Sequence, residues 1–266
     1  GNNSMPHPNN LNTTTILNTS LAKYLSWSGD VTSLEEHVKL SILQEHKLNM
    51  SEELLVSRLN KKEKYQTLFK KAFEKQENPI SLLNTQKAIS SYLRTLLTRG
   101  SYDKFIEGDN NAISQKAKNG LANFMNFGCK GCHTGMSLGA QNLQRFPLKK
   151  RATIYDLRVN VELYPEIKII DYSFPFENKG SFLGQGETNR FRVPILRNVT
   201  KTSPYFHNGS VEKIDEAVDI MGKHQLGLHL SKLQREEIVE FLKTLEGEIV
   251  DYNYDEYYKG EKNENN

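Results

Sequence analysis

The sequence predicts an all-α protein, and three observations support this class. Apolar residues recur along most of the chain at the three- and four-residue spacing of a helix, and helix-starting motifs precede several of these segments. Hardly any stretch alternates apolar and polar residues as a half-buried strand would. No internal repeat of fixed period is visible, and a chain of 266 residues is long enough for two domains of ordinary size.

Serines mark three of the expected helix starts. Ser33 is followed three residues later by Glu36, which is the spacing of a capping box, and Ser51 is followed at once by two acidic residues. Ser114 opens the segment that leads into the two cysteines of the chain. Helical segments are expected from 33 and from 51 onward and across 65–73, 82–97, 114–125, 215–221 and 233–245.

Three segments lack helical periodicity. Residues 1–20 are rich in Asn, Thr and Pro and are expected to form an extended lead-in. The stretch 145–190 is expected to be mostly irregular, and residues 251–266 are expected to form a loose polar tail.

The run Cys129-Lys130-Gly131-Cys132-His133 has the spacing of a c-type haem attachment motif. Two thiols on one turn of chain can form thioethers with the two vinyl groups of a porphyrin, and the histidine can then place a ring nitrogen on the iron. The group at the other axial position decides the chemistry. An open position admits oxygen or peroxide, whereas a methionine closes it for electron transfer.

Other uses of two close cysteines fit less well. A zinc site needs four ligands, and the chain has no further cysteine and no paired histidine spacing near the motif. A thioredoxin-like dithiol follows a strand, whereas the residues before Cys129 have a helical pattern. A structural disulfide between cysteines so close is uncommon. The motif therefore favours one covalent haem c.

Composition limits the partners. The chain is 37% hydrophobic and 25% charged, and its formal charge of +3 comes from interleaved basic and acidic residues, which argues against nucleic acid. No apolar run approaches the length of a membrane span. Covalent haem attachment takes place outside the bacterial cytoplasm, so a periplasmic protein is expected. The chain begins Gly1-Asn2-Asn3-Ser4 without a signal peptide, so we expect upstream residues to have been removed.

The runs 192–199 and 202–210, together with the haem motif, resemble the bacterial dihaem cytochrome c peroxidase family. The likeness continues through 216–227 and backward through Ser101-Tyr102-Asp103-Lys104-Phe105 to Thr15-Ile16-Leu17-Asn18 and Trp27. It implies two cytochrome c-like helical domains, 1–110 without a haem motif and 111–250 carrying one haem, followed by the tail 251–266.

The resemblance also implies roles for single residues. His133 would be the proximal ligand and Met221 the sixth ligand, although spacing alone would place Met221 in a core beside Ala217 and Val218. His207 and Arg197 would brace the haem or its propionates. Trp27 would lie between two haems, where a lone tryptophan would otherwise be core.

A calcium ion between the domains is a further implication of the resemblance. The matching positions are the side chain of Asn18 and the carbonyls of Thr202 and Pro204, and an all-oxygen site of this kind suits a hard cation. Asn18 could equally cap a turn.

Two departures limit what can be transferred from the family. These residues contain no second haem motif. Lys47 falls at the position of the peroxide-cleaving glutamate and His37 at that of a neighbouring glutamine, and a protonated lysine cannot take the proton that O–O cleavage requires. Peroxidase activity by this chain alone is therefore not expected.

The sequence thus predicts a periplasmic electron-transfer protein that uses a His/Met-ligated haem c and receives electrons from a small cytochrome c or cupredoxin. A homodimer is implied by the resemblance. The alternative is a cytochrome c peroxidase that reduces hydrogen peroxide to water and whose N-terminal haem segment is missing from this chain. Radical transfer, as in the tryptophylquinone-forming enzymes that share the fold, and a purely structural haem are weaker alternatives.

Overall fold

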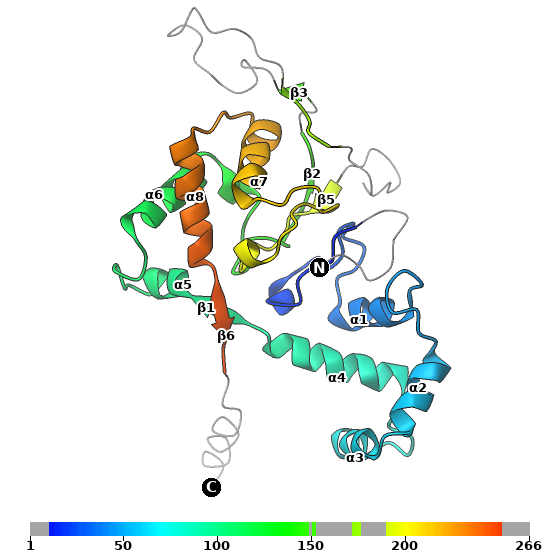
Figure 1. The fold of residues 1–266 in the computed structure, drawn as a ribbon. Helices are drawn as coiled ribbons and strands as arrows, with labels where there is room; N and C mark the ends of the chain where they lie inside the picture. Colours follow the sequence, from blue (N-terminus) through cyan, green and yellow to red (C-terminus); the bar gives the residue numbers. More distant parts are fainter. Residues whose placement is uncertain (1–10, 149–150, 153–171, 177–189, 252–266) are drawn as a thin grey trace, which may run out of the picture.

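The computed structural model describes residues 11–148, 151–152, 172–176 and 190–251, and within them helices predominate (Figure 1). The α-helices are α1 (Leu34–Leu43), α2 (Glu52–Asn60), α3 (Glu63–Ala72), α4 (Leu82–Thr95), α5 (Ser101–Ile106), α6 (Gln115–Asn126), α7 (Ile214–Ile220) and α8 (Lys232–Thr244). The 3-10 turns are η1 (Thr19–Leu21), η2 (Cys129–Gly131) and η4 (Val199–Lys201), and η5 (Met221–Leu226) is a π-helical turn.

Short strands form three antiparallel pairs, β1–β6, β2–β5 and β3–β4, in the described part of the chain. The strands are β1 (Thr98–Gly100), β2 (Leu143–Arg145), β3 (Arg151–Ala152), β4 (Tyr172–Ser173), β5 (Arg190–Arg192) and β6 (Gly247–Ile249). Each is too short to show an alternating pattern, so sequence analysis did not predict them. Most of 145–190, all of 1–10 and nearly all of the 251–266 tail lie outside the described residues.

Each expected helical segment coincides with a helix, and the predicted serine caps are present. The side chain of Ser33 accepts a hydrogen bond from the Glu36 N–H, that of Ser51 from the Leu54 N–H, and that of Ser114 from the N–H three residues on. These bonds satisfy N–H groups that have no partner within the helix. Helix α5 was not predicted. No helix in the described ranges is long and apolar enough to cross a bilayer.

One hydrophobic core lies in the N-terminal half, where α1 packs on α4. Its buried members come from the loop before α1 and from the inner faces of both helices. They are Leu25, Val31, Leu34, Val38, Ile42, Leu82, Leu93 and Leu96. Helices α2 and α3 extend away from this core at one end of the molecule (Figure 1).

A second core lies in the C-terminal half, where α6 packs closely on α8 (Figure 1). Gly120 makes this approach possible, because a Cβ atom there would lie 1.8 Å from the Glu237 carbonyl oxygen. Next to it the rings of Phe124 and Phe241 lie 5.3 Å apart. The buried side chains of this core are Phe124, Leu196, Leu230, Ile238, Phe241, Leu242 and Leu245.

The two halves repeat one backbone arrangement. Asn18 and Asn198 both adopt the left-handed conformation at the start of a 3-10 turn, with φ of 60° and 61°. The Asn18 N–H donates to the Leu96 carbonyl (2.8 Å), as the Asn198 N–H does to the Leu245 carbonyl (3.2 Å). The Asn18 side-chain oxygen accepts from Thr98 N, and that of Asn198 accepts from Gly247 N, both at 2.9 Å. The halves are therefore structural repeats, joined where β1 pairs with β6.

The repeat continues into the helices. Leu25 N donates to Val31 O (2.8 Å) before α1, and Tyr205 N donates to Val211 O (2.6 Å) before α7. Helix α1 therefore corresponds to α7 and α4 corresponds to α8. Helix α6 has no such counterpart on α4 among the described residues.

Candidate functional site

The haem motif follows α6 without an intervening strand. Gly128 has φ of +96°, which only glycine adopts readily, and it turns the chain out of the helix into η2. The His133 N–H donates to the Cys129 carbonyl (3.0 Å), so the motif closes into a compact turn. Cys129, Cys132 and His133 all line the same cavity.

His133 is held as a neutral imidazole with a defined tautomer. It is buried, and burial lowers its pKa to about 4 despite hydrogen bonds to the Leu138 and Pro194 backbone. A carbonyl oxygen only accepts, so the 3.1 Å contact between Nδ1 and the Leu138 carbonyl oxygen favours the tautomer with the proton on Nδ1 and the lone pair on Nε2. An imidazole oriented in this way is prepared to ligate a metal through Nε2.

The two cysteines are unsuited to thiolate chemistry. Burial raises the pKa of Cys129 to about 11 and raises that of Cys132 as well, so both remain thiols at neutral pH. Among the described residues no three His, Cys, Asp or Glu side chains are grouped as a metal site would require. The raised pKa values weigh against a reactive dithiol.

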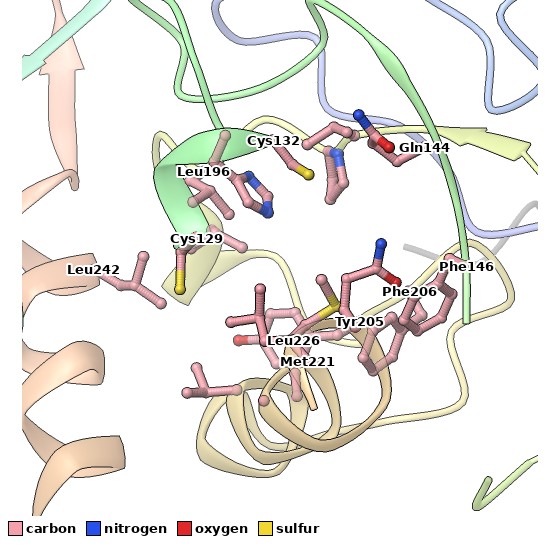
Figure 2. A pocket seen from close by; sticks show the side chains of 18 of the residues that line it. Cys129, Cys132, Gln144, Phe146, Leu196, Tyr205, Phe206, Met221, Leu226 and Leu242 are labelled. Atoms are coloured by element: carbon pink, nitrogen blue, oxygen red, sulfur yellow. The ribbon is translucent and has the colours of Figure 1, made fainter. Parts of the chain in front are cut away.

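Met221 faces the motif across the cavity. Figure 2 shows Cys129 and Cys132 on one wall and the Met221 thioether on the opposite wall. Met221 begins η5, where the helix that continues α7 widens into a π-helical turn. Such widened turns interrupt the regular ladder and often occur at functional positions.

The cavity fits a haem. Its walls are mainly apolar. Two thiols stand on one side and a thioether on the other (Figure 2), and the His133 imidazole also lines the cavity. Its polar lining side chains apart from the cysteines and His133 are Gln144, Arg192, Tyr205, His207 and Gln225. The donors present are those that covalent attachment and His/Met ligation of haem c require.

Trp27 and His207 both line this cavity. The Trp27 Nε1–H donates to the Asn12 carbonyl at 2.8 Å, and its ring lies edge-on to the ring of His207, with 6.3 Å between centroids. His207 is buried and stacks on Phe191 at 4.0 Å. The structure therefore places both predicted residues at the cavity.

Arg197 lies away from the cavity. Its guanidinium donates to both carboxylate oxygens of Asp103, at 2.6 and 2.8 Å, and to the Met136 carbonyl at 2.6 Å. The role predicted for Arg197 at the haem edge is corrected by this geometry, because its donors are already used to hold α5. The arginine that lines the cavity is Arg192, which sequence analysis did not select.

Known proteins resemble this chain in sequence and in structure. Residues 2–111 match the family model for di-haem cytochrome c peroxidase. The chain is 34% identical over 240 residues to cytochrome c551 peroxidase of Pseudomonas aeruginosa, covering 89% of this chain and 64% of that protein. It is 31% identical over 250 residues to cytochrome c551 peroxidase of Nitrosomonas europaea, covering 91% and 67%. The chain belongs to the di-haem cytochrome c peroxidase family.

Solved structures share the fold of this chain. A crystal structure of a MauG-like protein associated with microbial copper homeostasis matches with a TM-score of 0.72 at 20% identity, over 93% of this chain and 78% of that one. The diheme peroxidase BthA from Burkholderia thailandensis matches with a TM-score of 0.67 at 14% identity, over 92% and 74%. The chain thus spans about two thirds of its sequence relatives in the family.

The calcium ligand predicted at Asn18 is corrected. Its buried side chain donates to Thr98 Oγ1 (2.9 Å) and accepts from Thr98 N, so it does not face the Thr202 and Pro204 carbonyls. The amide of Asn12 lies there instead, 2.6 Å from the Pro204 carbonyl oxygen. The same arrangement at Asn198 supports a structural role for Asn18.

His37 and Lys47 lie in the N-terminal half and do not line the cavity. Burial, together with the charges of Lys47 and Arg192, lowers the pKa of His37 to about 4. Burial also lowers the pKa of Lys47, which the charge of Asp30 opposes. The repeat aligns His37 on α1 with Ala217 on α7, a residue of the haem cavity wall, so His37 occupies the corresponding face of its own half.

Proposed function

We propose that this protein is an electron-transfer haem c protein of the di-haem cytochrome c peroxidase family. The observation that carries the proposal is the opposition of the Cys129–His133 motif and Met221 across one apolar cavity. Bound haem would supply a one-electron couple. His133 and Met221 would occupy both axial positions, which leaves none for peroxide.

The remaining wall would tune and protect this centre. A thioether is a soft donor that favours ferrous iron and so raises the midpoint potential. Apolar neighbours such as Leu196, Ile238 and Leu242 exclude water from the site. The Leu138 carbonyl keeps the His133 ring in one orientation.

The domain division, location and partners belong to the same proposal. Residues 1–110 and 111–250 would be two cytochrome c-like domains, which the two cores and the repeated Asn18 and Asn198 caps support. The protein would be periplasmic and take electrons from a small cytochrome c or cupredoxin. A homodimer, and a calcium ion at the Thr202 and Pro204 carbonyls, are carried over from the family. The side chain near Pro204 is that of Asn12 rather than Asn18.

A second candidate function is hydrogen peroxide reduction by a longer, two-haem protein. The relatives named above are peroxidases, and one helix face supports a further packed segment. Phe241 and Ile238 of α8 are buried, with 0% and 2% of their surface exposed. The corresponding residues of α4, Tyr92 and Ile89, are 62% and 38% exposed. Lys47 at the position of the family's glutamate weighs against this candidate.

Counting haems in the protein purified from its native host separates the two candidates. One covalent haem by intact mass, reversible one-electron reduction and no peroxide-dependent oxidation of a reduced cytochrome c are expected for the electron-transfer protein. Two haems with turnover would establish the peroxidase. A protein without covalent haem would contradict both.

A further inference from the structure

Arg192 is a buried cation that has no counter-ion among the described residues. It ends β5 at 3% exposure, and its backbone N–H donates to the Trp27 carbonyl at 2.8 Å. The guanidinium carbon lies 5.1 Å from the centre of the Trp27 ring, and one terminal nitrogen donates to the Leu25 carbonyl at 3.3 Å. Its Nε–H is buried and has no hydrogen-bond partner in the described structure.

Such a group is costly unless something pairs with it. Burial lowers the pKa of Arg192 to about 10, so the guanidinium stays protonated at neutral pH. An ionised side chain in an apolar wall normally has an opposite charge and full hydrogen bonding. Arg192 has neither within the described ranges, although an aromatic face gives it partial compensation.

Arg197 shows how this chain treats a buried arginine elsewhere. Five residues further on, Arg197 forms a two-pronged ion pair with the Asp103 carboxylate and donates a third hydrogen bond to Met136. The difference lies in what each guanidinium faces. Arg197 faces α5, whereas Arg192 lines the cavity of the haem motif.

Among the described residues no carboxylate pairs with Arg192. The Asp30 carboxylate accepts hydrogen bonds from Ser26 and Ser28, and its charge acts on Lys47. On α1 and after it, His37 and Lys47 are basic or neutral, and the charge of Arg192 lowers the pKa of His37. The ionisable side chains that line the cavity are Cys129, Cys132, His133, Arg192, Tyr205 and His207, none of which is a carboxylate. The missing anion must therefore enter with the ligand of the cavity.

We propose that Arg192 binds a propionate carboxylate of the haem and holds that carboxylate against Trp27. The proposal rests on the proposed function, because it requires haem in this cavity. A haem carries two carboxylates and no other anionic substituent, and a guanidinium pairs well with a carboxylate. Arg192 is thus a positioning residue that fixes one edge of the cofactor and neutralises the charge of the propionate there.

The test is the pH dependence of the haem midpoint potential in Arg192→Gln, compared with the native holoprotein. With Arg192 present the paired propionate stays ionised between pH 5 and 8. The effect of this ion pair on the haem midpoint potential is therefore constant over that range. Without the guanidinium the propionate pKa rises, because a buried carboxylate loses its partner. Reduction then takes up a proton, so the potential of Arg192→Gln should match the native value at pH 5 and fall progressively below it toward pH 8.

Controls separate pairing from other effects. Arg192→Lys keeps the charge and should restore a profile parallel to the native one, and Arg190→Gln removes an exposed arginine from the same strand and should change nothing. A constant offset of Arg192→Gln at every pH would mean a distant charge effect and would overturn the proposal. An unchanged profile would overturn it too.

The same samples report on the proposed function independently. The methionine–iron charge-transfer band of the ferric protein shows whether His133 and Met221 ligate the haem. If this band is present in all variants and their midpoint potentials depend on pH in the same way, only the role of Arg192 is rejected. Absence of the band from the native protein would reject His/Met ligation itself.

Discussion

Met221 lies where α7 gives way to the π-helical turn η5, and it lines the cavity. Helical spacing of three and four residues places Met221 on the same side as Val218 and Ala217, and both of these residues also line the cavity. The methionine is therefore part of an apolar wall and, under the proposed function, a ligand as well. A substitution separates the two roles.

We expect Met221→Ala to open the sixth position of the iron and to lower the midpoint potential, because the soft donor that favours ferrous iron is lost. Ferric spectra with and without added imidazole or cyanide, together with a potentiometric titration, measure both effects. Met136→Ala serves as the control, since Met136 is exposed and absent from the cavity lining. If the Met221→Ala spectrum equals that of the native protein, Met221 is not the ligand.

The Asp103–Arg197 pair gives stability that depends on pH. Burial alone would raise the pKa of Asp103, but hydrogen bonds from Arg197 and the Gly100 N–H, with the charge of Arg197, lower it overall. A pKa lower in the folded state stabilises the protein above the unfolded value of about 4, and this contribution disappears as pH falls through the folded pKa.

Asp103→Asn should therefore lower the free energy of unfolding by about 3 kcal/mol at pH 7, because it leaves a buried guanidinium unpaired. The difference from the native protein should shrink as the pH falls below about 4, where the native carboxylate is protonated as well. Urea unfolding at several pH values measures this. Glu107→Gln is the control, since its pair with Arg99 is exposed. A pH-independent loss for Asp103→Asn would contradict the linkage.

Single residues also show what the sequence could and could not reveal. The haem motif is local, so five consecutive residues were enough to indicate its chemistry. The partners of Arg192, Arg197 and Asn18 lie far away in the chain, and nothing in their own neighbourhoods distinguishes a cavity residue from an ion pair or a cap. The resemblance to the family supplied the region of the site, but it selected Arg197, whereas the arginine that lines the cavity is Arg192.

Among the elements, helices were predictable because their signals are local. Serine caps and three- and four-residue spacing indicated each expected helix. The strands were not predictable, because β1 has three residues and exists only through its pairing with β6. The repeat was also missed, since it is conserved in backbone hydrogen bonds around Asn18 and Asn198 rather than in a fixed period of sequence.

The contact between α6 and α8 yields a prediction at this scale. Gly120→Ala should destabilise the protein by about 1–3 kcal/mol, because the added methyl group meets the Glu237 carbonyl and the helices must separate. Alanine is intrinsically the better helix former by about 1 kcal/mol. A loss of stability in Gly120→Ala would therefore come from the contact between α6 and α8. Thermal unfolding measures the change. Ala122→Gly, at an exposed position on the same helix, gives the propensity term alone.

A stabilising Gly120→Ala would mean that α6 and α8 are further apart than the structure places them. The haem spectrum should shift with the stability loss only if the movement reaches Phe124, which lines the cavity from α6. The two measurements therefore distinguish a local packing defect from a distortion of the site.

At the scale of the whole molecule, two repeats have unequal surroundings. In the C-terminal repeat α6 covers α8, whereas no helix among the described residues covers α4 in the same way. Corresponding aromatic residues record this difference, since Phe241 is fully buried and Tyr92 is largely exposed. Residues at corresponding positions of the two repeats therefore contribute unequally to the free energy of unfolding.

Truncating these two residues should give opposite results. Phe241→Ala should cost about 3–5 kcal/mol because it empties a packed core position. Tyr92→Ala should change the free energy of unfolding of this chain by no more than about 0.5 kcal/mol, because its ring is exposed to solvent. Denaturant unfolding of both variants measures this, with Phe105→Ala outside the two cores as a further reference. If the longer protein of the second candidate function places an α6-like helix on α4, Tyr92→Ala in that protein should become as costly as Phe241→Ala. An equally small effect in both contexts would mean that no such helix covers α4.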